Sequence, residues 1–141
     1  MTSPGNVVGT LSYMAPEQLL GEHVGFASDL YSVGACLYFA LAGRKPFEAK
    51  SQGEIAYALM QLEPEPLSTL RPDVGALGRV VHRALSKSPA QRFESAQAMH
   101  RAIAEAMAEG PATVDAPRHS STPTMSAFPA RATATPTSYV R

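Results

Sequence analysis

Apolar side chains are concentrated between residues 28 and 41, where they occupy nearly every position. A helix that is apolar on all sides is expected to lie at the centre of a core. Ser28 is a good N-cap for such a helix, and Gly43 followed by Pro46 should end it. The pattern therefore predicts a buried central helix over 28–41, with Cys36 packed inside the core.

Two further helices are predicted downstream of this run. Ser51 and Glu54 form a capping box, which opens a helix over 52–61. Residues 62–73 contain three prolines and are expected to form a long loop, at whose end Asp73 caps the next helix. The apolar side chains of that helix recur at helical spacing: Val74, Leu77, Val80, Val81, Ala84 and Leu85.

A last helix is expected to begin at the capping residue Ser95 and to reach about Glu109. Its apolar stripe consists of Ala96, Met99, Ile103 and Met107. Nearer the N-terminus, only residues 6–8 suggest extended chain, so the first 27 residues are predicted to be mostly loop. The body of the chain is therefore expected to be mainly α.

The segment from residue 110 to 141 differs in composition from the body. Residues 1–109 hold 25 of the 28 Leu, Ile, Val and Phe residues, whereas the last segment is rich in Pro, Ser, Thr and Ala. Such a segment buries too little apolar area to offset the entropy of ordering it. The sequence predicts one body over 1–109 and a disordered tail over 110–141. A flexible linker is favoured over a phosphorylatable tail, for which Thr122-Pro123 and Thr135-Pro136 would be the sites.

Charge and composition exclude several classes of protein. The 12 Lys and Arg residues balance 12 Asp and Glu residues, which argues against nucleic-acid binding through a basic field. No apolar run is long enough to span a membrane, and the N-terminus lacks a secretory signal. A single cysteine excludes a disulfide framework and fits a reducing cytoplasm. His82 and His100 have no second ligand at metal spacing, so no metal site is expected.

Four motifs follow one another along the chain. Residues 9–18 read G-T-L-S-Y-M-A-P-E-Q, and residues 29–34 read D-L-Y-S-V-G. Residues 43–47 read G-R-K-P-F, and residues 84–93 read A-L-S-K-S-P-A-Q-R-F. In this order and spacing they resemble the bacterial, eukaryotic-like Ser/Thr protein kinase family, whose signature set includes A-P-E. The resemblance covers residues 1 to about 108.

The resemblance implies the C-terminal, helical part of a protein-kinase-like fold, from the end of the activation segment through helices F to I. The N-lobe and the catalytic loop would be absent. In the family, the residues at Glu17 and Arg92 form a buried ion pair that ties the activation segment to the loop before the last helix. A guanidinium suits this role because its planar fork binds a carboxylate with two hydrogen bonds. The residues alone allow an alternative, in which two exposed charges never meet.

The resemblance also implies roles for residues near the N-terminus. The family's +1 loop, part of the substrate site, would include Gly9, Thr10 and Tyr13. Thr10 would help to shape the site for the substrate hydroxyl, or it is only a turn residue after Gly9. Asp29 would anchor the backbone of the catalytic loop, or it is only a first-turn acid favoured by the helix dipole. Thr2 and Ser3 are possible phosphorylation sites.

The motifs that bind ATP and Mg²⁺, the cofactors of the family, do not occur in the sequence. It contains no G-x-G-x-x-G and no V-A-I-K, and its aspartates are Asp29, Asp73 and Asp115. D-V-G at 73–75 follows the A-P-E segment instead of preceding it, and H-R-A at 82–84 and 100–102 lacks the catalytic Asp. In the family pattern the nucleotide site and the general base lie upstream of Met1. The chain alone is therefore expected to be inactive.

Three interpretations of function stay open. The chain is a truncated and inactive kinase domain, one half of a split kinase that needs a complementary fragment, or a docking module. In the last case the +1 loop and the helix over 52–61 would bind proteins without catalysis. Without the rest of a kinase domain, apolar side chains of the central helix are expected to lose part of their cover: Tyr31, Leu37, Tyr38 and Leu41.

Overall fold

The computed structural model describes residues 11–110 of the 141-residue chain. Several sequence predictions lie outside these residues: the +1 loop residues Gly9 and Thr10, the possible phosphorylation sites Thr2 and Ser3, the extended residues 6–8, and the tail from residue 111 onward. The division of the chain into a body and a tail therefore stays a prediction.

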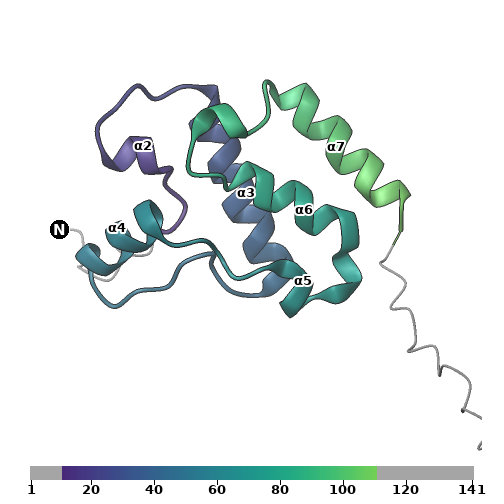
Figure 1. Ribbon diagram of the computed structural model, residues 1–141, viewed down its shortest axis with the longest axis horizontal. Helices are drawn as coiled ribbons and strands as arrows, with labels where there is room; N and C mark the ends of the chain where they lie inside the picture. The colour runs from purple at the N-terminus through teal and green to yellow at the C-terminus, as the bar shows by residue number, and fades with distance from the viewer. Residues whose placement is uncertain (1–10, 111–141) are drawn as a thin grey trace, which may run out of the picture.

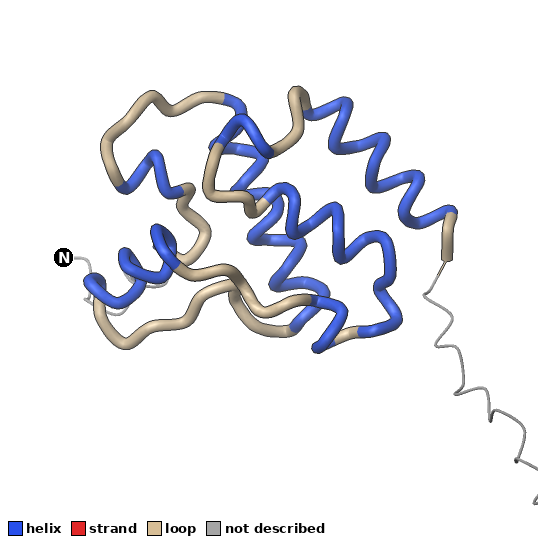
Figure 2. The backbone as a smooth tube through the Cα atoms, viewed as in Figure 1, coloured by secondary structure: helices blue, strands red, loops and turns tan. Residues whose placement is uncertain are grey.

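The described residues form helices joined by loops, with no strand among residues 11–110 (Figure 2). The elements in chain order are α2 (Pro16–Leu19), α3 (Phe26–Ala42), α4 (Gln52–Gln61), α5 (Leu67–Leu70), the 3₁₀-helix η1 (Pro72–Val74), α6 (Gly75–Ala84), the 3₁₀-helix η2 (Pro89–Gln91) and α7 (Ala96–Ala108). The prediction of a mainly α body is confirmed. No helix within these residues is long and apolar enough to cross a bilayer.

Helix α3 runs through the middle of the molecule, between two groups of elements (Figure 1). Helices α2 and α4 lie at one end, and α7 lies at the other end against α6. One buried cluster joins α3 to α4, α5 and α6; its largest fully buried members are Tyr31, Tyr38, Ile55, Leu59, Leu67, Val81 and Leu85. A second cluster joins α3 and α6 to α7 and contains Leu30, Ala84, Phe93 and Met99. The central helix therefore connects both halves of the core.

Helices α3 and α6 approach each other closely at Gly34. A Cβ atom added there would lie 2.7 Å from the Cβ atom of Ala84, which is far inside van der Waals contact. The close contact explains why the central helix contains a glycine, which otherwise weakens a helix interior.

The predicted ends of α3 are half correct. Gly43 ends the helix as expected, with φ +71° and its N–H bonded to the Phe39 carbonyl at 2.9 Å. The N-cap, however, is Gly25 and the helix begins at Phe26, so the assignment of Ser28 as the cap is wrong. Ser28 is buried in the first turn because its hydroxyl donates a hydrogen bond to the carboxylate of Glu17.

The bounds of α4 and the start of α7 agree with the sequence. The hydroxyl of Ser51 accepts from the N–H of Glu54 at 3.2 Å, and that of Ser95 accepts from the N–H of Ala98 at 3.1 Å. The prediction for Asp73 is wrong, because α6 has Val74 as its N-cap. The Asp73 carboxylate is instead held by the guanidinium of Arg71 at 2.7 and 2.8 Å.

Two features of the predicted loop and of the last helix also differ. The proline-containing stretch 62–73 holds two short helical turns, α5 and part of η1, which no helical repeat in the sequence signals. In α7, Met99 is buried as the stripe predicts, whereas Met107 is 69% exposed, and the neighbouring Ala106 is buried in its place.

The sequence predicted that the central helix is buried on every side, and this prediction is wrong for α3. Phe26, Val33 and Phe39 are 59%, 46% and 44% exposed, and Cys36, assigned to the core, is exposed with them. The residues expected to lose cover are partly different ones. Tyr31 and Tyr38 are fully buried between the helices, while Leu37 and Leu41 are half-buried. We call Phe26, Val33, Cys36 and Phe39 the open face of α3.

Candidate functional site

The structure brings together Glu17 and Arg92, which are 75 residues apart in the chain. The Arg92 Nη1 atom lies 2.6 Å from Glu17 Oε1, and Nη2 lies 2.8 Å from Oε2, so the pair is bidentate. The exposed fractions of the two side chains are 0% and 4%. The alternative of two exposed charges that never meet is therefore wrong.

The guanidinium of Arg92 uses all five of its N–H groups. Besides the two bonds to Glu17, it donates to three carbonyl oxygens, those of Ser86, Ala27 and Lys87, at 2.8, 2.8 and 3.0 Å. Its carbon centre also lies 4.9 Å from the centre of the Tyr31 ring. A buried charge is tolerated only when its donors are satisfied, and here none is left over. Arg92 therefore joins α2, the start of α3 and the segment after α6.

The carboxylate of Glu17 is held in its charged form. Burial acts to raise its pKa, but the hydrogen bonds from Arg92 and Ser28 outweigh that effect, so the pKa lies below its usual value. The Ser28 hydroxyl donates to Oε1 at 2.7 Å. Sequence analysis missed this third member, although a polar residue at the start of an otherwise apolar run is a signal for a buried hydrogen bond.

Tyr13, assigned to the +1 loop, is fixed to the central helix. The hydroxyl of Ser32 donates to the backbone oxygen of Tyr13 at 2.9 Å, and the Lys45 ammonium lies 5.8 Å from the centre of the Tyr13 ring. Ala15, between Tyr13 and Glu17, is fully buried. The segment is thus anchored on both sides, by Ser32 before α2 and by Arg92 within it. Sequence analysis did not single out Ser32, which lies inside the D-L-Y-S-V-G motif.

Asp29 stands apart from this anchored segment. Its side chain is exposed in the first turn of α3. This position fits an acid favoured by the helix dipole, and it leaves the carboxylate accessible to another segment.

The described residues contain no cluster suited to a metal ion, since no three His, Cys, Asp or Glu side chains gather within residues 11–110. His82 has a structural contact: its Nε2 atom accepts the N–H of Leu67 at 3.0 Å, and its ring meets that of Tyr38 edge-on. Burial lowers the pKa of His82, so the ring is kept neutral as an acceptor.

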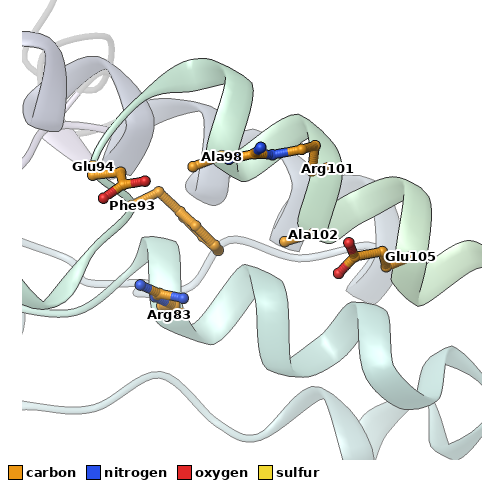
Figure 3. Close-up of a pocket in the computed structure, with 7 residues that line it drawn as sticks. All are labelled: Arg83, Phe93, Glu94, Ala98, Arg101, Ala102 and Glu105. Carbon is orange, nitrogen blue, oxygen red and sulfur yellow. The ribbon is translucent and has the colours of Figure 1, made fainter.

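A groove of about 360 Å³ lies between α6 and α7 (Figure 3). Phe93, Ala98 and Ala102 line its apolar part. Its charged residues are of both signs: Arg83, Glu94, Arg101 and Glu105. The guanidinium of Arg83 lies 4.4 Å from the centre of the Phe93 ring. Because its charges are balanced and it holds no nucleophile with a neighbouring base, the groove does not have the composition of a catalytic site.

Comparison with known proteins decides the family. The model of the protein kinase domain matches residues 2–104. The chain belongs to the protein kinase family. The four motifs and the helical body are therefore those of a kinase domain, and the resemblance seen in the sequence is confirmed.

The curated relatives of this chain include bacterial Ser/Thr protein kinases. The kinase chain is 49% identical over 96 residues to the serine/threonine-protein kinase PksC of Streptomyces coelicolor. The matched stretch covers 67% of this chain and 17% of PksC. It is 38% identical over 146 residues to the serine/threonine-protein kinase pkn3 of Myxococcus xanthus, covering 100% of this chain and 27% of pkn3. The chain thus spans less than a third of the length of either relative.

Solved structures show the same fold. The PknI kinase domain of M. tuberculosis is 32% identical, with a TM-score of 0.57 over 68% of this chain and 36% of that chain. The twitchin kinase region of C. elegans, which is 24% identical with a TM-score of 0.58, shares only its fold with this chain. The kinase chain therefore has the fold of the C-terminal, helical part of a kinase domain, as the sequence predicted.

Proposed function

We propose that this chain forms the substrate-facing, helical part of a Ser/Thr protein kinase domain that acts on proteins in the cytoplasm. In the family, the γ-phosphoryl group of ATP is transferred to a protein Ser or Thr. The observation that carries the proposal is the clamp on Glu17. Its bidentate, buried contact with Arg92 holds the A-P-E segment, and Ser32 holds Tyr13 just before it. A segment fixed at both points is suited to hold a substrate chain in register.

The residues present do not fit ATP with Mg²⁺. The two aspartates within residues 11–110 are exposed, and Asp73 is already paired with Arg71. Phosphoryl transfer depends on cations that neutralise the charge on the phosphates and on a base that accepts the hydroxyl proton. We therefore propose that the 141-residue chain alone transfers no phosphoryl group, and that the catalytic groups come from a complementary segment of a kinase domain.

The open face of α3 is the surface that such a segment would cover. Phe26, Val33 and Phe39 are each more than two-fifths exposed on the helix that forms the centre of the core. Asp29 lies on the same exposed side of the helix and is free to bind backbone N–H groups of an added segment. Apolar side chains on a central helix favour an additional layer of protein.

Calorimetric titration of the full chain with Mg-ATP tests the first part of the proposal. We expect no saturable heat, whereas saturable binding in the micromolar range would contradict it. A second titration adds a fragment that carries the Gly-rich loop and the catalytic loop. Binding of this fragment, with phosphorylation of a protein substrate by the mixture only, would support a split kinase. Val33→Lys should abolish the complex, while Lys50→Glu, at an exposed lysine before α4, is the matched control.

The second candidate function is docking without catalysis. Tyr57 is 62% exposed on α4 and Leu62, at its end, is 46% exposed, so the helix presents apolar groups to solvent. This candidate is favoured if the complementary fragment does not bind, yet Tyr57→Ala weakens binding of a protein partner while leaving the thermal unfolding of the chain unchanged. Exposed aromatic residues are frequent anchors of protein interfaces.

A further inference from the structure

The Lys87 ammonium occupies an unusual position at the C-terminal end of α4. Its Nζ atom donates to the carbonyl oxygens of Ala58 and Leu59, at 3.2 and 2.8 Å. It also lies 4.2 Å from the centre of the ring of Phe47, which is itself buried. The last carbonyls of a helix lack partners within the helix and carry its negative dipole end. Lys87 therefore caps α4 from a segment 28 residues away in the chain.

Within the described residues, the backbone adds one bond at this end of α4: the Leu62 N–H donates to the Ala58 carbonyl at 3.0 Å. Leu62 follows it in an extended conformation, with neither a glycine in the left-handed region nor a basic residue in the last turn. On the inner side, Ile55, Ala58 and Leu59 pack into the core. The Lys87 ammonium is thus the side-chain group that binds this end of the helix, and Tyr57 lies on the same helix.

The backbone of Lys87 belongs to the Glu17 clamp. Its carbonyl oxygen accepts from Arg92 Nη2 at 3.0 Å, while its side chain reaches α4. One residue thus connects the segment that ends the activation loop with the helix that carries Tyr57. A shift of α4 or of the segment around Glu17 would therefore move the backbone at Lys87.

We propose that Lys87 is a charge-dependent latch, which holds α4 in place as the ammonium and releases its C-terminal end, with Tyr57, when the charge is lost. A neutral amine keeps its N–H groups but loses the attraction to the helix dipole and to the face of Phe47. The latch itself does not depend on kinase activity; only its consequence for a partner at Tyr57 rests on the docking function proposed above.

The surroundings of Lys87 lower the pKa of its ammonium, so that mildly alkaline solution removes the charge. Burial lowers its pKa to about 8, and the negative charge of Glu63, which follows α4, opposes this shift. Arg92, which donates to the carbonyl oxygen of Lys87 and is paired with the Glu17 carboxylate, carries a positive charge throughout.

Native-state proteolysis of the full chain tests the latch. Chymotrypsin cleaves after Tyr57 only when α4 opens, and after the buried Phe93 only when the body unfolds. The ratio of the two cleavage rates, identified by fragment mass, therefore reports local opening of α4. From about pH 7 to about pH 9.5 we expect this ratio to rise by about tenfold in the wild-type chain.

Three variants complete the experiment. Lys87→Arg keeps the charge and should hold the ratio low at both pH values, whereas Lys87→Met should raise it at both. Lys50→Met, an exposed lysine before α4, is the matched control and should follow the wild type. A Lys87→Met chain as resistant at Tyr57 as the wild type would overturn the proposal. If Lys87→Met fails to fold, the same rise with pH in wild type and Lys87→Arg would overturn it.

Discussion

At the residue scale, the buried pair makes the strongest prediction. Glu17→Ala or Arg92→Ala strands one charge among buried groups, and each should destabilise the chain by about 3–5 kcal/mol. Removing both partners together should cost clearly less than the sum, because no stranded charge remains. Urea unfolding of the four chains measures this cycle. Additive effects of the two single changes would show that the contact carries no coupling energy.

Milder variants keep the measurement within range if the alanine variants unfold. Ser28→Ala removes the hydroxyl that donates to Glu17 at 2.7 Å, and a hydrogen bond to a charged group is worth about 1.5–3 kcal/mol. Arg79→Ala breaks the exposed pair with Glu109 and serves as the matched control. We expect little change in the control, because exposed ion pairs contribute little to stability.

His82 predicts a dependence of stability on pH. Its ring accepts the Leu67 N–H, and burial holds its folded pKa below the ordinary value. The unfolded chain therefore binds a proton more readily, so stability is complete above the ordinary pKa and falls as the pH drops through it. Unfolding free energies should decrease from about pH 7.5 to about pH 5.5. His82→Gln should remove much of this decrease, whereas His100→Gln on exposed α7 should keep it; equal slopes in all three chains would refute the assignment.

The residues of the clamp were predictable only in part. Glu17 and Arg92 belong to motifs with recognisable spacing, and a carboxylate and an Arg beside apolar residues suggest a pair. Ser28, Ser32 and Lys87 act through contacts with backbone or side chains 11 to 29 residues away, which have no local pattern in the sequence. A serine at a helix start fits a cap as well as a buried hydrogen bond, and only tertiary packing decides between them.

At the element scale, the contact between α3 and α6 leaves no room for a side chain at Gly34. Gly34→Ala would place a methyl group 2.7 Å from the Cβ of Ala84 and force the helices apart. We expect a loss of about 1–3 kcal/mol from overpacking, measured by urea unfolding. Gly53→Ala in α4 meets nothing within 4 Å and should be neutral or stabilising. A neutral Gly34→Ala would mean that the two helices separate without cost.

The sequence predicted a helix boundary correctly where the capping residue bonds only to neighbouring residues. Ser51 and Ser95 cap their helices, and Gly43 ends α3, because each uses only its own neighbours. Asp73 does not cap α6 because its carboxylate accepts a hydrogen bond at 2.7 Å from the guanidinium of Arg71, two residues before it. The turns of α5 and η1 are too short for a periodic pattern, so the sequence indicated only a loop.

At the scale of the whole molecule, the periodicity of α3 indicated burial but not which neighbours provide it. A helix with apolar residues on all sides predicts several packing partners. The structure provides α4, α5, α6 and α7 for one side, and leaves Phe26, Val33 and Phe39 open on the other. The prediction that Tyr31 and Tyr38 lose cover is wrong, because both are buried. The sequence of a single helix does not indicate which of its faces packs against which element. That information lies in contacts between segments far apart in the chain.

The open face of α3 leads to the last prediction, which concerns the full chain in solution. Three large apolar side chains on one helix face form a patch that should bind a hydrophobic dye and enhance its fluorescence. The double variant Val33→Gln with Phe39→Gln should lose most of this signal and still unfold cooperatively, because both side chains are nearly half exposed. Tyr57→Gln on α4 is the control and should keep the signal. A wild-type chain that binds no dye, or a double variant that binds as much, would show that this face is covered by another part of the chain.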